Sequence, residues 1–290
     1  AVSITEQFPH HNLSWKILGA VLKQTGRVSE AVFAGEKAIE ITPDDAEAHS
    51  NLGVMLQELG RLEEAEATLM QAITLKPDYA EAHYNLGVML QELSRLDEAE
   101  ASYRQVILLK PDYTQAHSNL GNVLQELGRL EEAETSYTQA IVLRPDYANA
   151  HNNLGITLQE MGRLDEAEAC YRIAISLKPD LVGAYSNLGN TLKELGKLEE
   201  AEASYRQAIV LKSNFSEAHI NLGNTLKELG RLEDAELSYI QAIVLEPDDA
   251  VGHSNLAITL QELGRLDEAE ASCRQAIVLK PDYAEAHYNL

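Results

Sequence analysis

Residues Ala80–Tyr113 read AEAHYNLGVMLQELSRLDEAEASYRQVILLKPDY and contain two apolar patterns at helical spacing. The first pattern recurs at steps of three and four residues at Ala82, Leu86, Leu90 and Leu93. The second pattern recurs in the same way at Leu96, Ala99, Tyr103, Val106 and Ile107. Such steps place apolar side chains on one face of a helix. The stretch therefore predicts a helix, a short turn and a second helix.

This stretch is one copy of a unit that repeats through the chain with a period of 34 residues. Prolines mark the period at Pro43, Pro77, Pro111, Pro145, Pro179, Pro247 and Pro281, and Ser213 fills the one gap. Eight complete units cover residues 12–283 and begin at residues 12, 46, 80, 114, 148, 182, 216 and 250. Residues 1–11 form a lead-in, and residues 284–290 begin a ninth, truncated unit. No linker remains for a second domain, and we expect the chain to be a piece of a longer protein.

The ends of the helices carry recognisable residues. Most units have glycine at the turn between the helices: Gly26, Gly60, Gly128, Gly162, Gly196, Gly230 and Gly264. Glycine enters the left-handed conformation of a helix C-cap without steric cost. Ser94 stands at this position in one unit, so we expect a less stable turn there. The spacing of Asp44 with Glu47 and of Asp78 with Glu81 predicts a capping box at the start of the following first helix.

Small residues recur where the two helices of a unit must meet. The eighth position of the unit is Gly19, Gly53, Gly87, Gly121, Gly155, Gly189, Gly223 and, in the last unit, Ala257. A glycine inside a helix costs about 1 kcal/mol relative to alanine, so its recurrence indicates a close approach of the paired helices. We expect the large side chains at position 24 to fill the next layer: Leu69, Tyr103, Tyr137, Tyr171, Tyr205 and Tyr239.

The unit resembles the tetratricopeptide repeat, whose signature residues in the first unit are Trp15, Leu18, Gly19, Leu22, Ala31, Gly35, Ala38 and Pro43. Gly35 departs from that signature, and Leu22 stands where the family usually has tyrosine. The resemblance implies an all-α fold, a right-handed α-solenoid superhelix of stacked helix-turn-helix units. It also implies that the first helices line a concave groove and the second helices form the convex side. Stacking is expected on physical grounds too, because one helix pair cannot bury both of its apolar faces alone.

The composition excludes several classes of partner. The chain has 46 Asp and Glu against 23 Lys and Arg, a formal net charge of -23. Such a surface repels the phosphates of nucleic acids and anionic membranes, so we expect neither as a partner. No run approaches the roughly 18 apolar residues of a membrane span, and Cys170 and Cys273 fit no disulfide framework or metal spacing. We therefore expect a cytoplasmic protein without a cofactor.

Histidine recurs at position 4 of the unit, at His49, His83, His117, His151, His219, His253 and His287. A ladder of metal sites is one interpretation. Neighbouring helices stand about 10 Å apart, however, and adjacent imidazoles cannot share an ion at Zn–N distances near 2 Å. Trp15 and Tyr185 hold the same position in other units, which favours packing. We predict half-buried structural histidines and no metal site.

Asparagine at position 6 is the strongest candidate for function. It occupies Asn51, Asn85, Asn119, Asn153, Asn187, Asn221 and Asn255, although asparagine is a mediocre helix former. One helical step from the inward leucine turns this position towards the groove, where a column of amides would match the N–H and C=O groups of an extended peptide. The Asn-Leu-Gly motif resembles the asparagine ladder of O-linked N-acetylglucosamine transferases, which holds the backbone of protein substrates. A hydrogen bond between neighbouring helices is the alternative interpretation.

Some first helices carry further polar residues at two other positions of the unit. Asn122, Asn190 and Asn224 stand at position 9, where other units have valine or isoleucine. Lys193 and Lys227 replace the glutamine of position 12. The resulting Asn-x-x-Asn-x-x-Lys stripe is a candidate for recognising acidic side chains or a terminal carboxylate. Simple drift between duplicated copies would explain the same pattern.

No catalytic constellation stands out, because serines, histidines and carboxylates all recur at the repeat spacing and no phosphate-binding loop is present. We therefore expect no enzyme activity within the chain. The sequence predicts a protein-interaction scaffold that binds an extended peptide or a partner helix. The alternative is the substrate-recruiting arm of a larger glycosyltransferase similar to O-linked N-acetylglucosamine transferase. Because the last unit lacks a polar capping helix, end-to-end self-association near Leu290 is also expected.

Overall fold

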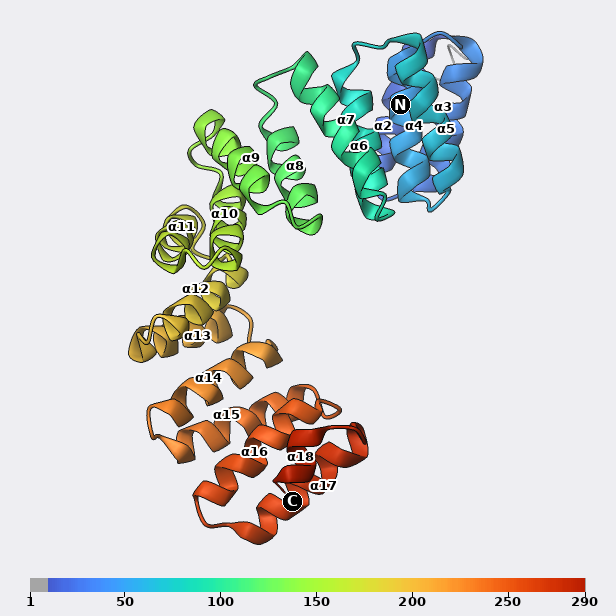
Figure 1. Cartoon of the computed structure of the whole chain (residues 1–290). Helices are drawn as coiled ribbons and strands as arrows, with labels where there is room; N and C mark the ends of the chain where they lie inside the picture. Colours follow the sequence, from blue (N-terminus) through green and yellow to red (C-terminus); the bar gives the residue numbers. More distant parts are fainter. Residues whose placement is uncertain (1–9, 290) are drawn as a thin grey trace. The chain divides into compact units, whose positions relative to one another are not determined.

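The computed structural model of the chain describes residues 10–289, which form seventeen α-helices and no strand (Figure 1). The first helices of the eight units are α2 (Asn12–Gln24), α4 (Ala46–Glu58), α6 (Ala80–Glu92), α8 (Thr114–Glu126), α10 (Ala148–Glu160), α12 (Val182–Glu194), α14 (Ser216–Glu228) and α16 (Ala250–Glu262). The second helices are α3 (Val28–Ile41), α5 (Leu62–Leu75), α7 (Leu96–Leu109), α9 (Leu130–Leu143), α11 (Leu164–Leu177), α13 (Leu198–Leu211), α15 (Leu232–Leu245) and α17 (Leu266–Leu279). Helix α18 (Ala284–Tyr288) opens the ninth unit. Most of the lead-in, and Leu290, lie outside the described residues.

The helices form two compact bodies, residues 1–145 and 146–290, and the boundary falls between two units. In each body the two helices of a unit pack against each other, and each second helix packs against the first helix of the following unit. Neighbouring first helices also touch, as α4 does α6 and α12 does α14. The prediction of an all-α array of stacked helix pairs is confirmed within each body.

The turns inside the units adopt the left-handed conformation that the glycines predict. Gly60 has a φ of 80°, and its N–H donates to the Gln57 carbonyl at 2.9 Å. The next residue, Arg61, donates to the Leu56 carbonyl, also at 2.9 Å, so the last carbonyls of α4 are satisfied. Ser94 has a φ of 57°, the one positive value among the non-glycine residues described. Its Cβ makes this turn more strained than the others.

We predict that Ser94→Gly stabilises the N-terminal body by about 0.5–1 kcal/mol. Removing the Cβ relieves the steric strain of the left-handed backbone. This gain exceeds the loss that glycine causes by raising the entropy of the unfolded chain. Urea unfolding followed by circular dichroism measures the change. The matched control is Gly128→Ser in the equivalent turn, which should destabilise by a similar amount. An unchanged or lower stability of Ser94→Gly would contradict the strain.

The glycines at the eighth position let the second helix press a large side chain against the first. A Cβ placed on Gly189 would lie 2.6 Å from Cε1 of Tyr205, and one on Gly121 would lie 2.6 Å from Cε1 of Tyr137. These separations are far below van der Waals contact, so the predicted close approach is confirmed. In the last unit the first helix carries a Cβ, at Ala257, and the facing residue is the smaller Cys273. Both of these side chains are fully buried.

We predict that Gly189→Ala destabilises the C-terminal body by about 1–2 kcal/mol, because overpacking against Tyr205 outweighs the gain of about 1 kcal/mol in helix propensity. In a Tyr205→Cys background, which reproduces the Ala257–Cys273 pair, the same substitution should be neutral or stabilising. A double-mutant cycle in urea measures the difference. A substitution that destabilises both backgrounds equally would show that the ring does not need the glycine.

The predicted capping boxes are wrong. Helix α4 is capped by Asp45, whose carboxylate accepts from the Ala48 N–H at 3.0 Å, and not by Asp44. Helix α6 has Tyr79 at the N-cap and no side-chain cap. The aromatic ring is held instead by Lys76, whose ammonium lies 5.1 Å from the ring centroid. The helices therefore begin one residue after the position that a capping box with Asp44 or Asp78 requires.

Candidate functional site

The asparagines at position 6 lie on the first helices, where one unit meets the next. Five of them are half-buried and donate a hydrogen bond from the amide nitrogen to the preceding unit. These bonds run from Asn85 to Ser50 Oγ (3.1 Å), Asn119 to Tyr84 Oη (3.1 Å), Asn187 to Asn152 Oδ1 (3.3 Å), Asn221 to Asn190 Oδ1 (3.2 Å) and Asn255 to Asn224 Oδ1 (3.3 Å). The amides thus join neighbouring first helices.

The expectation of a column of unpaired amides is therefore wrong for these five residues, and the alternative of a bond between helices is observed. The reason is geometric: position 6 faces the preceding first helix as much as the surface. Only one side of each amide is used in this way. Within residues 10–289, the carbonyl oxygens of Asn85, Asn119, Asn187, Asn221 and Asn255 accept no hydrogen bond.

Two position-6 asparagines remain, Asn51 and Asn153. Asn153 Oδ1 accepts a hydrogen bond from Asn152 Nδ2 of its own helix at 3.1 Å. Asn51 is exposed and makes no hydrogen bond with residues 10–289. Its preceding unit carries Lys16 at position 5 and Ala20 at position 9, and neither side chain has an acceptor. Asn51 lines a cavity of about 270 Å³ with these two residues.

A buried tyrosine hydroxyl determines what stands at positions 9 and 12. The rings at position 24 are fully buried, and burial raises the pKa of Tyr205 and Tyr239, so the hydroxyls stay protonated and need an acceptor. Where position 12 is glutamine, its Oε1 accepts: Tyr103 donates to Gln91 (3.2 Å), Tyr137 to Gln125 (3.2 Å) and Tyr171 to Gln159 (3.1 Å).

Lysine at position 12 cannot accept this proton, and asparagine at position 9 takes over. Tyr205 Oη donates to Asn190 Oδ1 and Tyr239 Oη donates to Asn224 Oδ1, both at 2.7 Å. The same two oxygens also accept the position-6 amides of the following units. The asparagine–lysine stripe is therefore a coupled structural replacement, which corrects its interpretation as drift. Asn122 accepts from Tyr137 at 2.7 Å in a unit that retains the glutamine.

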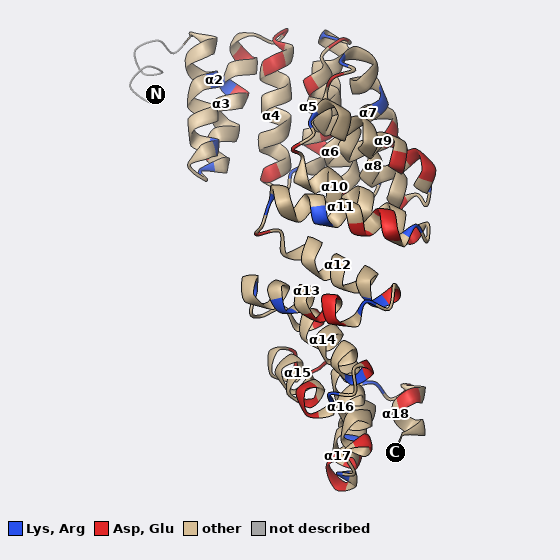
Figure 2. Ribbon diagram, turned by 90° about the vertical axis from the view of Figure 1, so that its left-hand side faces the viewer, with Lys and Arg blue, Asp and Glu red and all other residues tan. Residues whose placement is uncertain are grey.

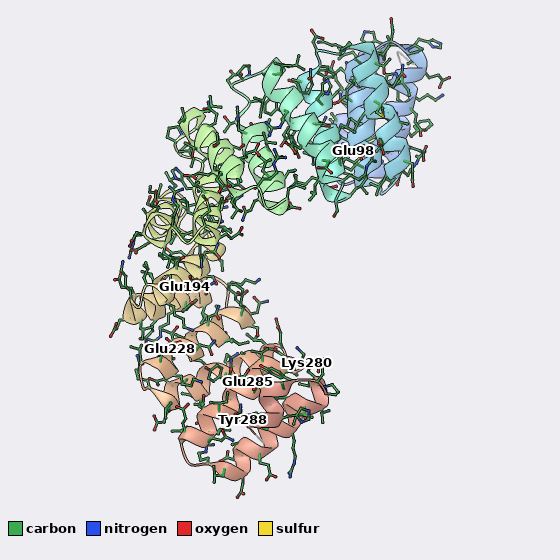
Figure 3. All side chains as sticks on the ribbon, in the orientation of Figure 1. Glu98, Glu194, Glu228, Lys280, Glu285 and Tyr288 are labelled. Carbon is green, nitrogen blue, oxygen red and sulfur yellow. The ribbon has the colours of Figure 1, made fainter. Side chains whose placement is uncertain are left out.

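The two lysines of the stripe are not equivalent. Lys193 Nζ forms an ion pair with Glu228 Oε1 at 2.9 Å, between α12 and α14, and Figure 3 labels this glutamate. Gln159 makes the corresponding bond to Glu194 at 2.7 Å, so Lys193 continues a structural column. Its expected role as a free cationic spot is corrected accordingly. Lys227 forms no ion pair with any residue from 10 to 289.

We predict that Asn190→Val destabilises the C-terminal body by about 1–3 kcal/mol, because the buried Tyr205 hydroxyl loses its acceptor and Lys193 cannot replace it. The matched control is Asn190→Val/Lys193→Gln, which reproduces the combination of Val88 and Gln91 that holds the Tyr103 hydroxyl, and it should recover part of that loss. Urea unfolding compares the two. Equal losses would show that the cost does not come from the tyrosine hydroxyl.

Histidines at position 4 connect the first helices that carry them to the turn before the helix. His49 Nε2 lies 2.8 Å from the carbonyl oxygen of Pro43, and His117 Nε2 lies 2.9 Å from that of Pro111. The Nε2–H tautomer donates this bond, which satisfies a carbonyl at the end of the preceding unit. The structural interpretation of the histidines is the one observed for these two residues.

Arginines at position 16 connect the second helices, a role that the sequence reasoning missed. Arg95 binds Glu98 of its own helix at 2.6 Å and Glu66 of the preceding unit at 2.7 Å. The same fork recurs at Arg129, Arg231 and Arg265. The signal was present in the sequence as arginine three residues before an acidic residue. Figure 2 marks the acidic residues in red and the basic residues in blue on the ribbon of the helices.

We predict that Glu98→Gln lowers the thermal midpoint at neutral pH and that the loss vanishes in acid. The hydrogen bond from Arg95 holds the pKa of Glu98 below its ordinary value of 4.5. A lowered folded-state pKa gives stabilisation that is present above that value and disappears as the pH falls. Thermal unfolding between about pH 7 and pH 3 tests this. Asp97→Asn, the neighbouring carboxylate that arginine does not bind, is the control and should show no such dependence.

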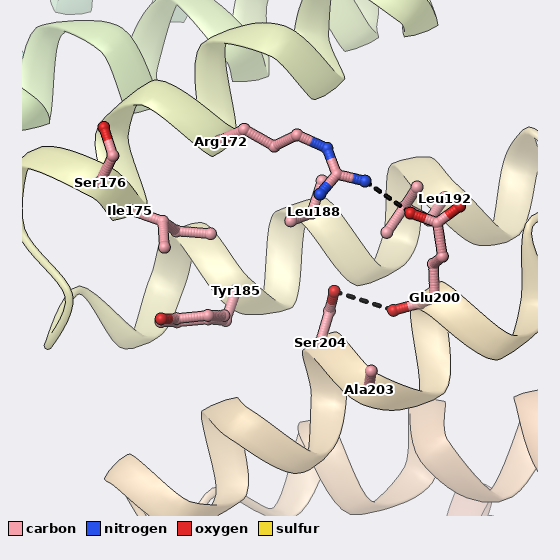
Figure 4. Close-up of a pocket in the computed structure, with 9 residues that line it drawn as sticks. All are labelled: Arg172, Ile175, Ser176, Tyr185, Leu188, Leu192, Glu200, Ala203 and Ser204. Carbon is pink, nitrogen blue, oxygen red and sulfur yellow. Dashed lines mark hydrogen bonds and ion pairs between the residues drawn. The ribbon is translucent and has the colours of Figure 1, made fainter.

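Shallow grooves also open between consecutive second helices. One of about 400 Å³ lies over α11, α12 and α13, with Ile175, Tyr185 and Leu188 among its lining residues. Figure 4 shows Arg172 at its rim, bound to Glu200 at 2.6 Å. Equivalent grooves of about 560 and 360 Å³ occur at α7–α9 and at α13–α15. The grooves are a second recurring surface feature, distinct from the first-helix asparagines.

Comparison with sequence families gives matches along most of the chain. Profiles described as tetratricopeptide repeat match residues 34–67, 80–113, 112–180, 146–214 and 254–280. A profile described as TPR repeat matches residues 55–94 and 223–264. No curated protein sequence matches the chain significantly.

Many solved structures share the fold. The APC/C hetero-tetramer Cut9-Hcn1 has a TM-score of 0.63 at 17% identity over 91% of this chain, which spans about half (52%) of that one. PilF of Pseudomonas aeruginosa has a TM-score of 0.62 at 20% identity, over 76% of this chain and 96% of its own. YrrB, described as a TPR protein with an unusual peptide-binding site, has a TM-score of 0.56 at 22% identity, over 64% and 96%. Likeness at these identities establishes the architecture alone.

Proposed function

The chain belongs to the tetratricopeptide repeat family, and we propose that it is a protein-interaction scaffold that binds an extended peptide along its first helices. Within one body, we call the surface that carries positions 6, 9 and 12 of the first helices the first-helix face. The observation that supports the proposal most is the row of position-6 carbonyl oxygens that stacking leaves without a partner within residues 10–289. The peptide-binding site named for YrrB agrees with this class of function.

The first-helix face offers both kinds of hydrogen-bonding group. The carbonyl oxygens of Asn221 and Asn255 are acceptors for peptide N–H groups. The amide nitrogens of Asn190 and Asn224, whose carbonyls are bonded in the fold, are donors for peptide C=O groups. The stacking bonds orient the amides of Asn187, Asn221 and Asn255 on α12, α14 and α16. An extended backbone also has both N–H and C=O groups, and its recognition needs no particular side chains.

The charge and the helix lengths of the chain bear on the class of partner. The net charge of -23 disfavours nucleic acids and anionic membranes, and no helix in the described part of the chain is long and apolar enough to span a bilayer. End-to-end self-association stays a prediction, because Leu290 lies outside the described residues; Tyr288, labelled in Figure 3, is 90% exposed at this end. The glycosyltransferase arm also stays a prediction, and no described contact favours it.

The proposal is tested by asking whether binding depends on the backbone N–H groups of the peptide. Peptides selected from a random display library with the full chain are resynthesised with N-methylated amides, which removes donors and leaves side chains in place. We expect affinity, measured by fluorescence anisotropy, to fall by about tenfold or more. Asn51→Ala is the informative protein variant for peptides that bind the N-terminal body, because this amide has no bond within residues 10–289 and its loss should leave stability unchanged.

Two outcomes would contradict the proposal. Selected peptides that tolerate N-methylation throughout would show that the backbone is not read. Peptides that cross-link only to the second helices would show that the binding surface lies elsewhere. A partner helix in place of an extended peptide would appear as selected sequences with apolar residues at three- and four-residue spacing.

A further inference from the structure

Helix α15 carries an apolar stripe that faces solvent. Leu237 is 65% exposed, Ile240 40% and Val244 65%, and their spacing of three and four residues places them on one face of the helix. Across the adjacent groove, Val210 of α13 is 76% exposed. We call these four residues the α15 patch. An exposed apolar cluster of this kind marks an interaction surface more often than an isolated apolar residue does.

The patch borders a groove that can accept side chains. The groove between α13 and α15 has a volume of about 360 Å³, and Val210 and Leu237 stand at its edges. Ile209 and Leu222 also line it, and both are partly or fully buried, so the groove has an apolar floor. A groove between two helices fits the ridge of side chains on a third helix.

Exposed valine or leucine at position 29 recurs in several units, and Phe33 and Met70 are exposed at positions 22 and 25 of the first two units, but only α15 joins apolar residues at positions 22, 25 and 29. Position 25 is arginine at Arg104, Arg172, Arg206 and Arg274 but isoleucine at Ile240. Position 31 is a cation at Lys76, Lys110, Arg144, Lys178, Lys212 and Lys280 but a carboxylate at Glu246. Position 22 is alanine at Ala203 and Ala271 but leucine at Leu237. Relative to the units named, this unit therefore has a leucine for alanine, an isoleucine for arginine and a glutamate for a cation.

The charges around the patch complement a basic partner. Glu233 lies in the first turn of α15, and Glu246 and Asp248 follow its last turn, all three exposed. Arg206, a cation that lines the groove, is paired with Glu202 at 2.7 Å. A second copy of this chain, with its net charge of -23, would bring like charges together at such a surface.

We propose that the α15 patch is a second docking surface, which binds an amphipathic helix with apolar residues at i, i+3 or i+4 and i+7 and with lysine or arginine beside them. The apolar side chains of the partner enter the groove between α13 and α15. Its cations lie against Glu233 at one end and Glu246 and Asp248 at the other. This surface belongs to the second helices and is independent of the asparagines of the first-helix face.

The test uses the full chain and a fluorescent, amidated 16-residue helical peptide with leucine on one face and lysine on the other. The patch variant is Leu237→Ala/Ile240→Arg/Val244→Ser/Glu246→Lys, which introduces residues that other units carry at these positions, as at Ala203, Arg206, Ser176 and Lys212. The control is Leu108→Ser/Val142→Ser, two exposed side chains of the N-terminal body. Circular dichroism checks that both variants retain the thermal midpoint.

We expect the patch variant to bind about tenfold more weakly in fluorescence anisotropy, and the control to bind as the parent does. A peptide with glutamate in place of lysine should also bind about tenfold more weakly. The proposal is overturned if the parent does not bind the lysine peptide, if patch and control variants lose equally, or if the glutamate peptide binds as tightly. A concentration-dependent dimer in sedimentation that the patch variant abolishes would assign the patch to a second copy instead.

Discussion

Six of the eight units depend on the contact between the glycine in the first helix and the large side chain at position 24 of the second. The missing Cβ at a residue such as Gly189 lets the ring of Tyr205 lie against the helix backbone, where the ring is fully buried. That contact also carries a polar group inwards, because the ring brings its hydroxyl to the first helix. A buried hydroxyl without an acceptor is costly, so the packing dictates the polar residues around it.

The acceptor for that hydroxyl links packing to stacking. In the units with lysine at position 12, one oxygen of Asn190 or Asn224 accepts both the tyrosine of its own unit and the amide of the next. The hydrogen-bonding groups that remain for a ligand are those that stacking does not use. Candidate binding residues on this array therefore have a structural role as well, and Asn51 is the instructive exception because its neighbours Lys16 and Ala20 offer no acceptor.

Ion pairs also join neighbouring units. The arginines of position 16 bind one carboxylate of their own unit and one of the preceding unit, so much of the acidity serves to join second helices. Departures from the other copies at exposed positions are informative as well. Helix α15 has Ile240 where four other units have arginine and Leu237 where five have alanine, and both side chains are exposed, so the fold gains no buried contact from them. A change that the fold does not need is the better guide to a partner.

The helices, their turns and the close approach of each pair could all be read from residue order, because the period, the apolar spacing and the glycines act locally or recur at a fixed distance. Even the strained turn at Ser94 was predictable. The hydrogen-bond partner of each asparagine side chain could not be predicted from the sequence. Whether Asn221 faces a ligand or Asn190 depends on the distance between side chains that are 31 residues apart, and a helical step alone leaves both directions open. Only the packed units decide between them, because the contact that satisfies the amide exists only after the helices have stacked.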